Sequence, residues 1–179
     1  MKKNITWLFA ATLLILLFSA CIKDTDFNET IQLTPVVELN LIHFNLDAGA
    51  FYDEATATPI LTVRDTTELR FLEESTIQES VTKAEFYYKF TNSISRDFLI
   101  DFQFLNEAND TTYTTQALVS QGSIVSPVLS EHFDTLEGDP LLQLFEASKL
   151  VLHVTISSSD ENVVGNLNMQ SKTTYYLEF

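Results

Sequence analysis

Three residue types that serine hydrolases use lie close together in this chain, at Ser130, His132 and Asp134. A hydrolytic triad needs convergent side chains, because the histidine takes the serine proton while the aspartate orients the histidine. Alternate residues of one strand project in parallel, and the chain has no G-x-S-x-G turn to expose a nucleophile. The sequence therefore predicts no catalytic residue and no enzyme. A hydrolase is kept only as an alternative in which Ser130 or a carboxylate pair meets a histidine.

Two pairs of adjacent carboxylates are of the type used in glycoside hydrolysis, namely Asp53 with Glu54 and Glu73 with Glu74. Glycosidases hold two carboxyl groups about 5 to 9 Å apart across the scissile bond. Adjacent residues of a loop do not set such a separation. Solvated charge clusters are therefore the expected interpretation.

The three histidines, His43, His132 and His153, lie far apart and lack the spacing of a helical or loop metal site. The single cysteine excludes an internal disulfide and a site built from several thiolates. The sequence therefore predicts no metal and no cofactor.

Aromatic residues offer a different chemistry, which is ligand binding by stacking. Tyr87 and Lys89 share the strand face that points away from the predicted core, and Tyr176 lies near the end of the chain. A tyrosine ring presents an apolar face and carries a hydroxyl for hydrogen bonding. We expect Tyr87, Lys89 and Tyr176 to contact a ligand or a partner, and a ligand-binding function predicts a concave aromatic patch around Tyr87 or Tyr176.

Alternation of apolar and polar residues is the dominant pattern after Pro35 and is typical of β-strands. The clearest examples are segments 84–91 and 98–104, in which the apolar face is rich in phenylalanine. Turn-forming residues at 92–97 separate the two segments. We therefore predict that they form a hairpin and pack their phenylalanine faces on the same core.

Six further strands are expected, at 36–44, 59–63, 68–72, 112–119, 149–157 and 173–179. One short helix is predicted at 140–147, with Asp139 as its N-cap and Pro140 in its first turn. Its apolar face would contain Leu141, Leu144 and Phe145. About eight strands and one helix, without a linker or repeat, predict an all-β domain over 36–179, an immunoglobulin-like β-sandwich.

Residues 1–20 have the composition of a signal peptide, with Lys2 and Lys3 followed by an apolar run over 7–18 and then by small residues. As a helix this run spans about 18 Å at about 1.5 Å per residue. The hydrocarbon core of a bilayer is about 30 Å thick. We therefore expect the segment to be cleaved rather than to remain as a transmembrane anchor.

Residues 17–21, Leu-Phe-Ser-Ala-Cys, resemble the lipobox of bacterial lipoproteins, which signal peptidase II cleaves. Phe18 departs from the pattern, because most members carry leucine there. The resemblance implies that Cys21 becomes the first residue of the mature protein, that its sulfur is diacylated, and that the lipid attaches the chain to a membrane.

Residues 21–35 are expected to form a lipidated, flexible tether. Ile22 would be the second residue of the mature protein. An aspartate at that position would resemble the inner-membrane retention signal of enteric bacteria, so with isoleucine there the outer membrane is the expected location. Lys23 with Asp24 and Asp26 resembles the export signal of Bacteroidota surface lipoproteins, which favours the cell surface over the periplasmic face. A solvated charged linker is the alternative.

Three Asp-Thr segments resemble the O-glycosylation sequon of Bacteroidota. The acceptors would be Thr66, Thr111 and Thr135, and each is expected to lie in a turn.

The mature chain is strongly acidic. Without Lys2 and Lys3 it has eight basic and 25 acidic residues, a formal net charge of −17. Such a surface is repelled by phosphate backbones and by anionic lipid headgroups. We therefore expect no nucleic-acid partner, and membrane attachment through the Cys21 lipid alone.

A small acidic domain on a lipid anchor, without a convergent catalytic site, is expected to act by binding. The interpretation we prefer is an accessory or binding subunit of a larger outer-membrane assembly, in barrel assembly, secretion or nutrient uptake. The alternative is a lipoprotein that binds a surface glycan or another small ligand.

Overall fold

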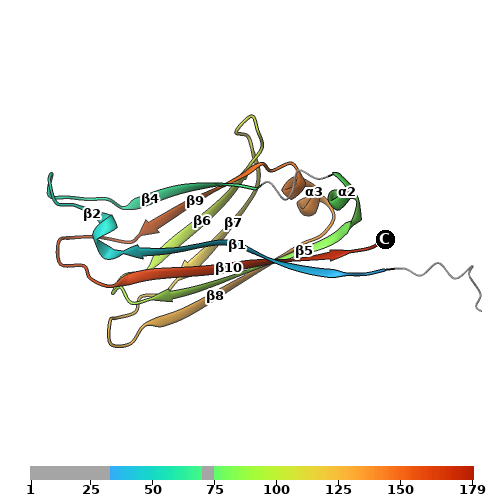
Figure 1. Ribbon diagram of the computed structural model, residues 1–179. Coiled ribbons are helices and arrows are strands. Elements are labelled where there is room, and N and C mark those ends of the chain that lie inside the picture. The colour runs from blue at the N-terminus through green and yellow to red at the C-terminus, as the bar shows by residue number, and fades with distance from the viewer. Residues whose placement is uncertain (1–32, 70–74) are drawn as a thin grey trace, which may run out of the picture. The chain divides into compact units, whose positions relative to one another are not determined.

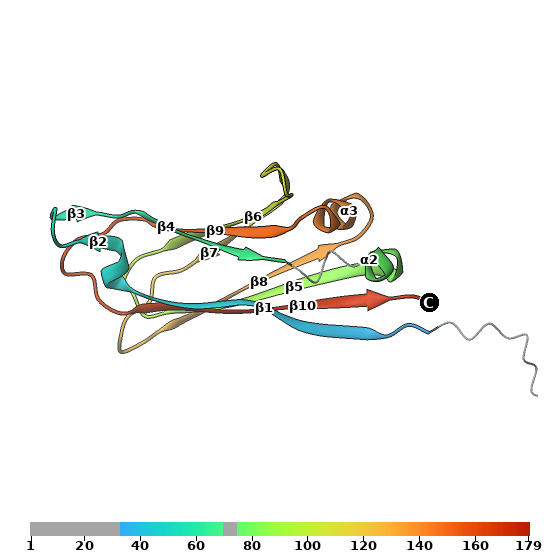
Figure 2. The same ribbon diagram turned by 45° about the horizontal axis from the view of Figure 1, so that its top comes forward.

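Two antiparallel four-stranded sheets face each other across one hydrophobic core in the computed structural model, which describes residues 33–69 and 75–179 (Figure 1). The first sheet has the strand order β1-β10-β5-β8, and the second sheet has the order β4-β9-β6-β7. Figure 2 shows the two sheets as separate layers. The long strands are β1 (Val36–Asp47), β4 (Thr62–Glu68), β5 (Val81–Asn92), β6 (Phe98–Leu105), β7 (Thr111–Val119), β8 (Val128–Leu136), β9 (Lys149–Ile156) and β10 (Asn166–Leu177).

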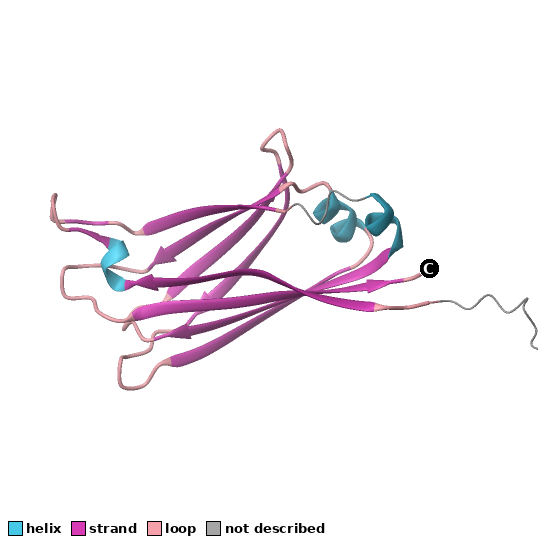
Figure 3. Cartoon of the chain, viewed as in Figure 1, coloured by secondary structure: helices cyan, strands magenta, loops and turns pink. Residues whose placement is uncertain are grey.

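Short elements close the ends of the two layers (Figure 3). The 3-10 helix η1 (Ala48–Phe51) and the ribbon of β2 (Tyr52–Asp53) and β3 (Thr58–Pro59) lie at one end. The helices α2 (Ser75–Ser80) and α3 (Asp139–Phe145) lie at the other end, where β10 ends. Within residues 33–69 and 75–179, no helix has the length and hydropathy needed to cross a bilayer.

The predicted all-β sandwich is confirmed, and its strand order defines the type. Numbered along the chain without β2 and β3, the eight long strands form sheets in the orders 1-8-3-6 and 2-7-4-5. This is the order of a jelly roll, in which two Greek keys build two facing sheets. The immunoglobulin-like expectation thus holds for the two-sheet architecture, whereas the connectivity is that of a jelly roll.

The predicted hairpin between residues 84–91 and 98–104 is wrong. β5 pairs with β10 and β8 in the first sheet, whereas β6 pairs with β7 and β9 in the second sheet. Residues 93–97 carry the chain from one sheet to the other, a separation of about 10 Å in packed sheets.

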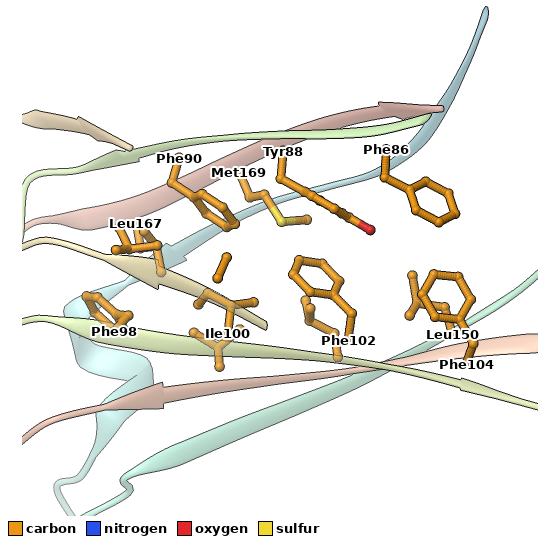
Figure 4. Packing of buried hydrophobic residues seen from close by; sticks show 14 of the residues in the cluster. Phe86, Tyr88, Phe90, Phe98, Ile100, Phe102, Phe104, Leu150, Leu167 and Met169 are labelled. Carbon is orange, nitrogen blue, oxygen red and sulfur yellow. The ribbon is translucent and has the colours of Figure 1, made fainter. Parts of the chain in front are cut away.

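The prediction that both phenylalanine faces pack on one core is correct, because the two rows meet across the sandwich (Figure 4). The ring centroids of Phe86 and Phe104 are 5.5 Å apart, and those of Tyr88 and Phe102 are 4.2 Å apart. All four side chains are buried.

A buried asparagine organises the corner where the chain changes sheets. The Asn92 Nδ2 group donates hydrogen bonds to the carbonyl oxygens of Arg96 (2.9 Å) and Ser120 (3.0 Å), and its Oδ1 accepts one from the Ile94 backbone N–H (2.8 Å). A Cβ atom at Gly122 would lie 1.9 Å from the Asn92 carbonyl oxygen, so only glycine fits there. The Asn92 side chain thereby supplies hydrogen-bond partners to backbone groups that leave the strand ladders where the chain crosses between the sheets.

The expected strands 59–63 and 68–72 both overlap β4 (Thr62–Glu68), which contains residues 62, 63 and 68 of them. Pro59 belongs to β3, and residues 70–72 lie outside the described residues. β8 was not predicted. Its apolar Leu129 and Phe133 point outward while Ser130, His132 and Asp134 point inward, which reverses the expected alternation.

β10 begins at Asn166, seven residues before the predicted start at residue 173, because polar Asn, Gln and Ser obscure its first half. The helix α3 also differs in detail. Asp139 is the first helical residue rather than the predicted N-cap. The N-cap is Gly138, which has φ +60°, and no side chain caps this end of the helix by a hydrogen bond. Leu141 and Leu144 are buried as expected.

We expect Asn92→Ala to lower the free energy of unfolding by about 2–3 kcal/mol, because it leaves the buried Ile94 N–H and two part-buried carbonyl groups without their partner. Asn45→Ala is the matched control. The Asn45 side chain is exposed and accepts one 3.3 Å hydrogen bond from Asn166, so the change should stay within about 0.5 kcal/mol. Urea denaturation measures both values. Equal stability of the two variants would contradict the role assigned to Asn92.

Candidate functional site

An open hollow of about 570 Å³ lies on the outer face of the first sheet and contains two of the predicted contact residues, Tyr87 and Tyr176. We call it the sheet hollow. Its lining comes from all four strands and comprises Val36, Glu38, Glu85, Phe86, Tyr87, Phe133, Asp134, Thr135, Lys172, Thr174 and Tyr176. The volume falls within the range of small-molecule sites, about 300–1,000 Å³.

Strand register places a row of short and acidic side chains along the middle of the sheet hollow. The Cα partners run across the sheet from Glu38 to Thr174, from Thr174 to Glu85 and from Glu85 to Thr135. The threonines are smaller than the side chains of the neighbouring rows. This row therefore forms the floor of the hollow.

Aromatic side chains from the two neighbouring rows form the walls. On one side Tyr176 is paired with Lys83, whose Nζ lies 3.7 Å from the centroid of the tyrosine ring. On the other side Tyr87 lies between Lys172 and Phe133, with the Tyr87 and Phe133 ring centroids 4.7 Å apart. The two rows are four residues apart along the strands, about 13 Å at about 3.3 Å per residue.

Hydrogen bonds hold the rim of the Tyr176 wall. The Tyr176 hydroxyl donates to Glu85 Oε2 (2.8 Å), and Lys83 Nζ donates to Glu85 Oε1 (2.8 Å). The hydrogen bond from Lys83 lowers the pKa of Glu85 below its usual range, and that from Tyr176 lowers it further. The Glu85 carboxylate in turn raises the pKa of both Lys83 and Tyr176. The wall is therefore built around an ionised carboxylate at neutral pH.

The opposite wall uses a second carboxylate. The Tyr87 hydroxyl donates a hydrogen bond to Glu131, and this bond raises the pKa of the tyrosine. Lys172 Nζ donates to Glu38 Oε1 (2.8 Å) at the far side of the hollow. Each lysine that adjoins the floor is thus already paired with a glutamate.

Lys89, the third predicted contact residue, is not among the lining residues. It lies on the same face, one row beyond Tyr87, and its Cα partners are Gln170 and Glu131. The sequence did not identify Phe133, Lys172, Glu38 or Glu85 as members of the site. The outward alternation of β5 contained the signal for Glu85, but strand register alone brings the other three to it.

The prediction that Ser130, His132 and Asp134 do not converge is wrong for one pair. His132 Nε2 lies 3.2 Å from Asp134 Oδ2, and the same nitrogen lies 3.2 Å from the Thr115 hydroxyl. The Ser130 hydroxyl instead accepts a 3.4 Å hydrogen bond from the Ser120 backbone N–H. Because both contacts of the imidazole fall on Nε2, the arrangement is not that of a triad.

The other chemical candidates lie apart from the sheet hollow. His43 is exposed in β1, and His153 is half-buried in β9. Asp53 ends β2, and its carboxylate accepts hydrogen bonds from the Ala55 N–H and the Thr56 hydroxyl, as in a turn. In the part of the chain that the structure describes, no cluster of three His, Cys, Asp or Glu residues has the geometry of a metal site.

The predicted O-glycosylation acceptors are exposed, but the expectation that they lie in turns is wrong. Thr66 lies within β4, Thr111 begins β7, and Thr135 lies within β8.

The anchor and export residues, Cys21, Lys23, Asp24 and Asp26, lie outside the described residues, as do Glu73 and Glu74.

No protein-family model matches the chain, and no curated protein matches it. A candidate secreted protein from Parabacteroides distasonis is similar in structure, with 13% identity, a TM-score of 0.44, and coverage of 64% of this chain and 37% of the other. A structure of the infectious bursal disease virus, Gx strain, has 9% identity, a TM-score of 0.44, and coverage of 80% of this chain and 32% of the other. The chain thus spans about a third of the length of these structures.

Substitutions in the Tyr176 wall test its electrostatics. We expect Tyr176→Phe to raise the pKa of Glu85 towards its usual range, and Lys83→Met to raise it further, because the lysine makes the larger contribution. The carboxylate pairing stabilises the wall at neutral pH and is lost as the pH falls through the lowered pKa. Carboxyl-detected NMR titration from about pH 2 to 7 measures the shift. Tyr113→Phe is the control, and an unchanged Glu85 pKa in Lys83→Met would contradict the assignment.

Proposed function

We propose that this protein is a lipid-anchored binding protein of the bacterial outer membrane. It serves as a non-catalytic subunit of a larger envelope assembly, in barrel assembly, secretion or nutrient uptake. The observation that carries this proposal is the sheet hollow, a recognition surface built from aromatic rings and paired charges. The cell surface is the favoured side, on the resemblance of Lys23, Asp24 and Asp26 to an export signal.

The anchor is supported by the lipobox residues that end at Cys21. The described chain enters the domain beside its C-terminus, because the Phe179 N–H donates to the Leu33 carbonyl (2.9 Å) and the Leu177 N–H donates to the Pro35 carbonyl (3.0 Å). This entry point lies at the end of the sandwich that also contains α2 and α3 (Figure 1).

A second candidate function is direct binding of a surface glycan or another small ligand. It is favoured by one specific observation, the two aromatic walls on either side of a polar floor. Rings fixed in this way offer stacking surfaces, and the floor offers hydrogen-bond acceptors. In a nutrient-uptake assembly the two functions would coincide.

The anchor is tested by Cys21→Ala. We expect the wild-type protein to sediment with outer membranes at high salt and to be released by detergent, because acyl chains rather than charges attach it. The Cys21→Ala variant should be released without detergent. Thr25→Ala, in the same segment, is the matched control. Retention of the Cys21→Ala variant in the membrane would contradict lipid anchoring.

The subunit role is tested by purification from solubilised outer membranes. We expect tagged wild-type protein to copurify with an outer-membrane protein in fixed stoichiometry. The double variant Tyr87→Ala/Phe133→Ala should copurify with much less of that partner than the wild type, because it removes one wall of the hollow. Leu118→Ala is the control, since Leu118 is 80% exposed on the second sheet. Recovery of the monomer alone from wild-type cells would contradict the proposal.

A further inference from the structure

We infer that the sheet hollow selects an uncharged, hydroxyl-rich ring, such as a hexose unit of a neutral glycan, and excludes anionic glycans. The inference rests on the proposed binding function and names the ligand class. It follows from the spacing of the walls, the charge of the floor and the fixed positions of the rings.

The spacing suits a single saturated ring. A ring stacked between two walls needs about 7–8 Å, which is two carbon contacts of about 3.5–4.0 Å each. The rows that contain Tyr176 and Tyr87 are about 13 Å apart along the strands. Backbone rows at this spacing leave room for a sugar ring to stack on one wall while its hydroxyl groups reach the floor.

The floor is chemically suited to hydroxyl groups. Glu38 and Glu85 are hydrogen-bond acceptors, and a carboxylate takes up to about four hydrogen bonds. Each of them accepts one from a lysine, and Glu85 accepts another from Tyr176. The remaining acceptor sites would receive the hydroxyl hydrogens of a sugar, as charge-assisted hydrogen bonds.

The same charges exclude an anionic ligand. Among the lining residues whose side chains point outward, the acids are Glu38 and Glu85 and the cation is Lys172, whereas the carboxylate of Asp134 points inward to His132. Lys172 and the neighbouring Lys83 are both paired with floor carboxylates. A uronate or sulfate would therefore meet carboxylates without an available cation, in a domain that is acidic overall.

The rings are held in place before a ligand binds. The hydroxyls of Tyr87 and Tyr176 are tied to Glu131 and Glu85, and Phe133 packs against Tyr87. A ligand thus has little side-chain ordering to impose, which favours binding.

Calorimetry on the full lipidated chain, in a detergent without a sugar headgroup, tests the inference. The probes are maltohexaose, cellohexaose and mannohexaose as neutral ligands and hexagalacturonate as an anion. We expect at least one neutral hexamer to bind, with an affinity at least tenfold higher than that of hexagalacturonate. Glu38→Gln should narrow the difference in affinity between the neutral ligands and hexagalacturonate, because it removes one negative charge from the floor.

Variants of the walls connect this binding to the sheet hollow. Phe133→Ala and Tyr87→Ala should each weaken neutral-ligand binding by about tenfold, as the loss of one stacked ring predicts. Tyr87→Phe keeps the ring and should bind within about threefold of the wild type, since it loses only the bond to Glu131. Leu118→Ala should leave binding unchanged. Circular dichroism verifies that each variant is folded.

Three outcomes would overturn the inference. Hexagalacturonate could bind as tightly as the neutral ligands, which would contradict the exclusion of anions. Neutral ligands could bind equally well to the wild type and the wall variants, which would place the site elsewhere. No hexamer could bind, which would refute the ligand class. The anchor and the subunit role are decided separately, by Cys21→Ala fractionation and by copurification.

Discussion

The chain must bury two aromatic rows that follow each other closely in sequence, and this requirement decides how the strands connect. In a hairpin, the rows of β5 and β6 would share one face of one sheet and would both need cover from other elements. Because the chain instead changes sheets after Asn92, each row covers the other. Full burial of one large apolar side chain contributes about 1.5–3 kcal/mol, whereas a typical hydrogen bond contributes about 0.5–1.5 kcal/mol net. Burial of the aromatic rows therefore drives the change of sheets. The Asn92 hydrogen bonds remove the free-energy penalty of the backbone groups that would otherwise lack partners there.

The outer face of the first sheet depends on the same constraint. Burial of Phe86, Tyr88 and Phe90 places the alternate residues Glu85 and Tyr87 on the opposite face of the sheet. Because β5 lies between β10 and β8, both residues have neighbours from the strands on either side. A slip of one residue would reverse both faces at once. The aromatic core therefore fixes the register of the strands that line the sheet hollow, although the core side chains lie on the opposite face of the sheet.

Local alternation was sufficient to predict most strands and the two phenylalanine-rich rows of the core. It did not reveal which sheet a strand joins, because turn-forming residues at 92–97 suit a crossing as well as a hairpin. It also failed for β8, an edge strand whose inner face is polar: Ser130, His132 and Asp134 point inward there, and His132 contacts Asp134 and Thr115.

The candidate site was only partly predictable for a related reason. Tyr87 and Tyr176 are visible as aromatic residues at outward positions, and the structure places both in the sheet hollow. Phe133, Glu38 and Lys172 come from strands that are distant in sequence, and long-range register brings them together. Lys89 illustrates the same limit, since one further row along β5 moves a side chain out of the lining.

The acidity of the domain gives the two parts of the proposed function separate roles. If residues 1–20 are cleaved as expected, the remaining chain has a formal charge of −17, which would oppose close approach to anionic headgroups over about 8–10 Å at physiological ionic strength. In the anchored state, the acyl chains would therefore hold the protein at the membrane while its charge keeps the sandwich from lying on the surface. Glu85 of the sheet hollow and the nearby Glu131 would contribute to this repulsion, and they also orient Tyr176 and Tyr87 respectively. The same groups would thus keep the recognition face away from the lipid and hold it ready for a ligand.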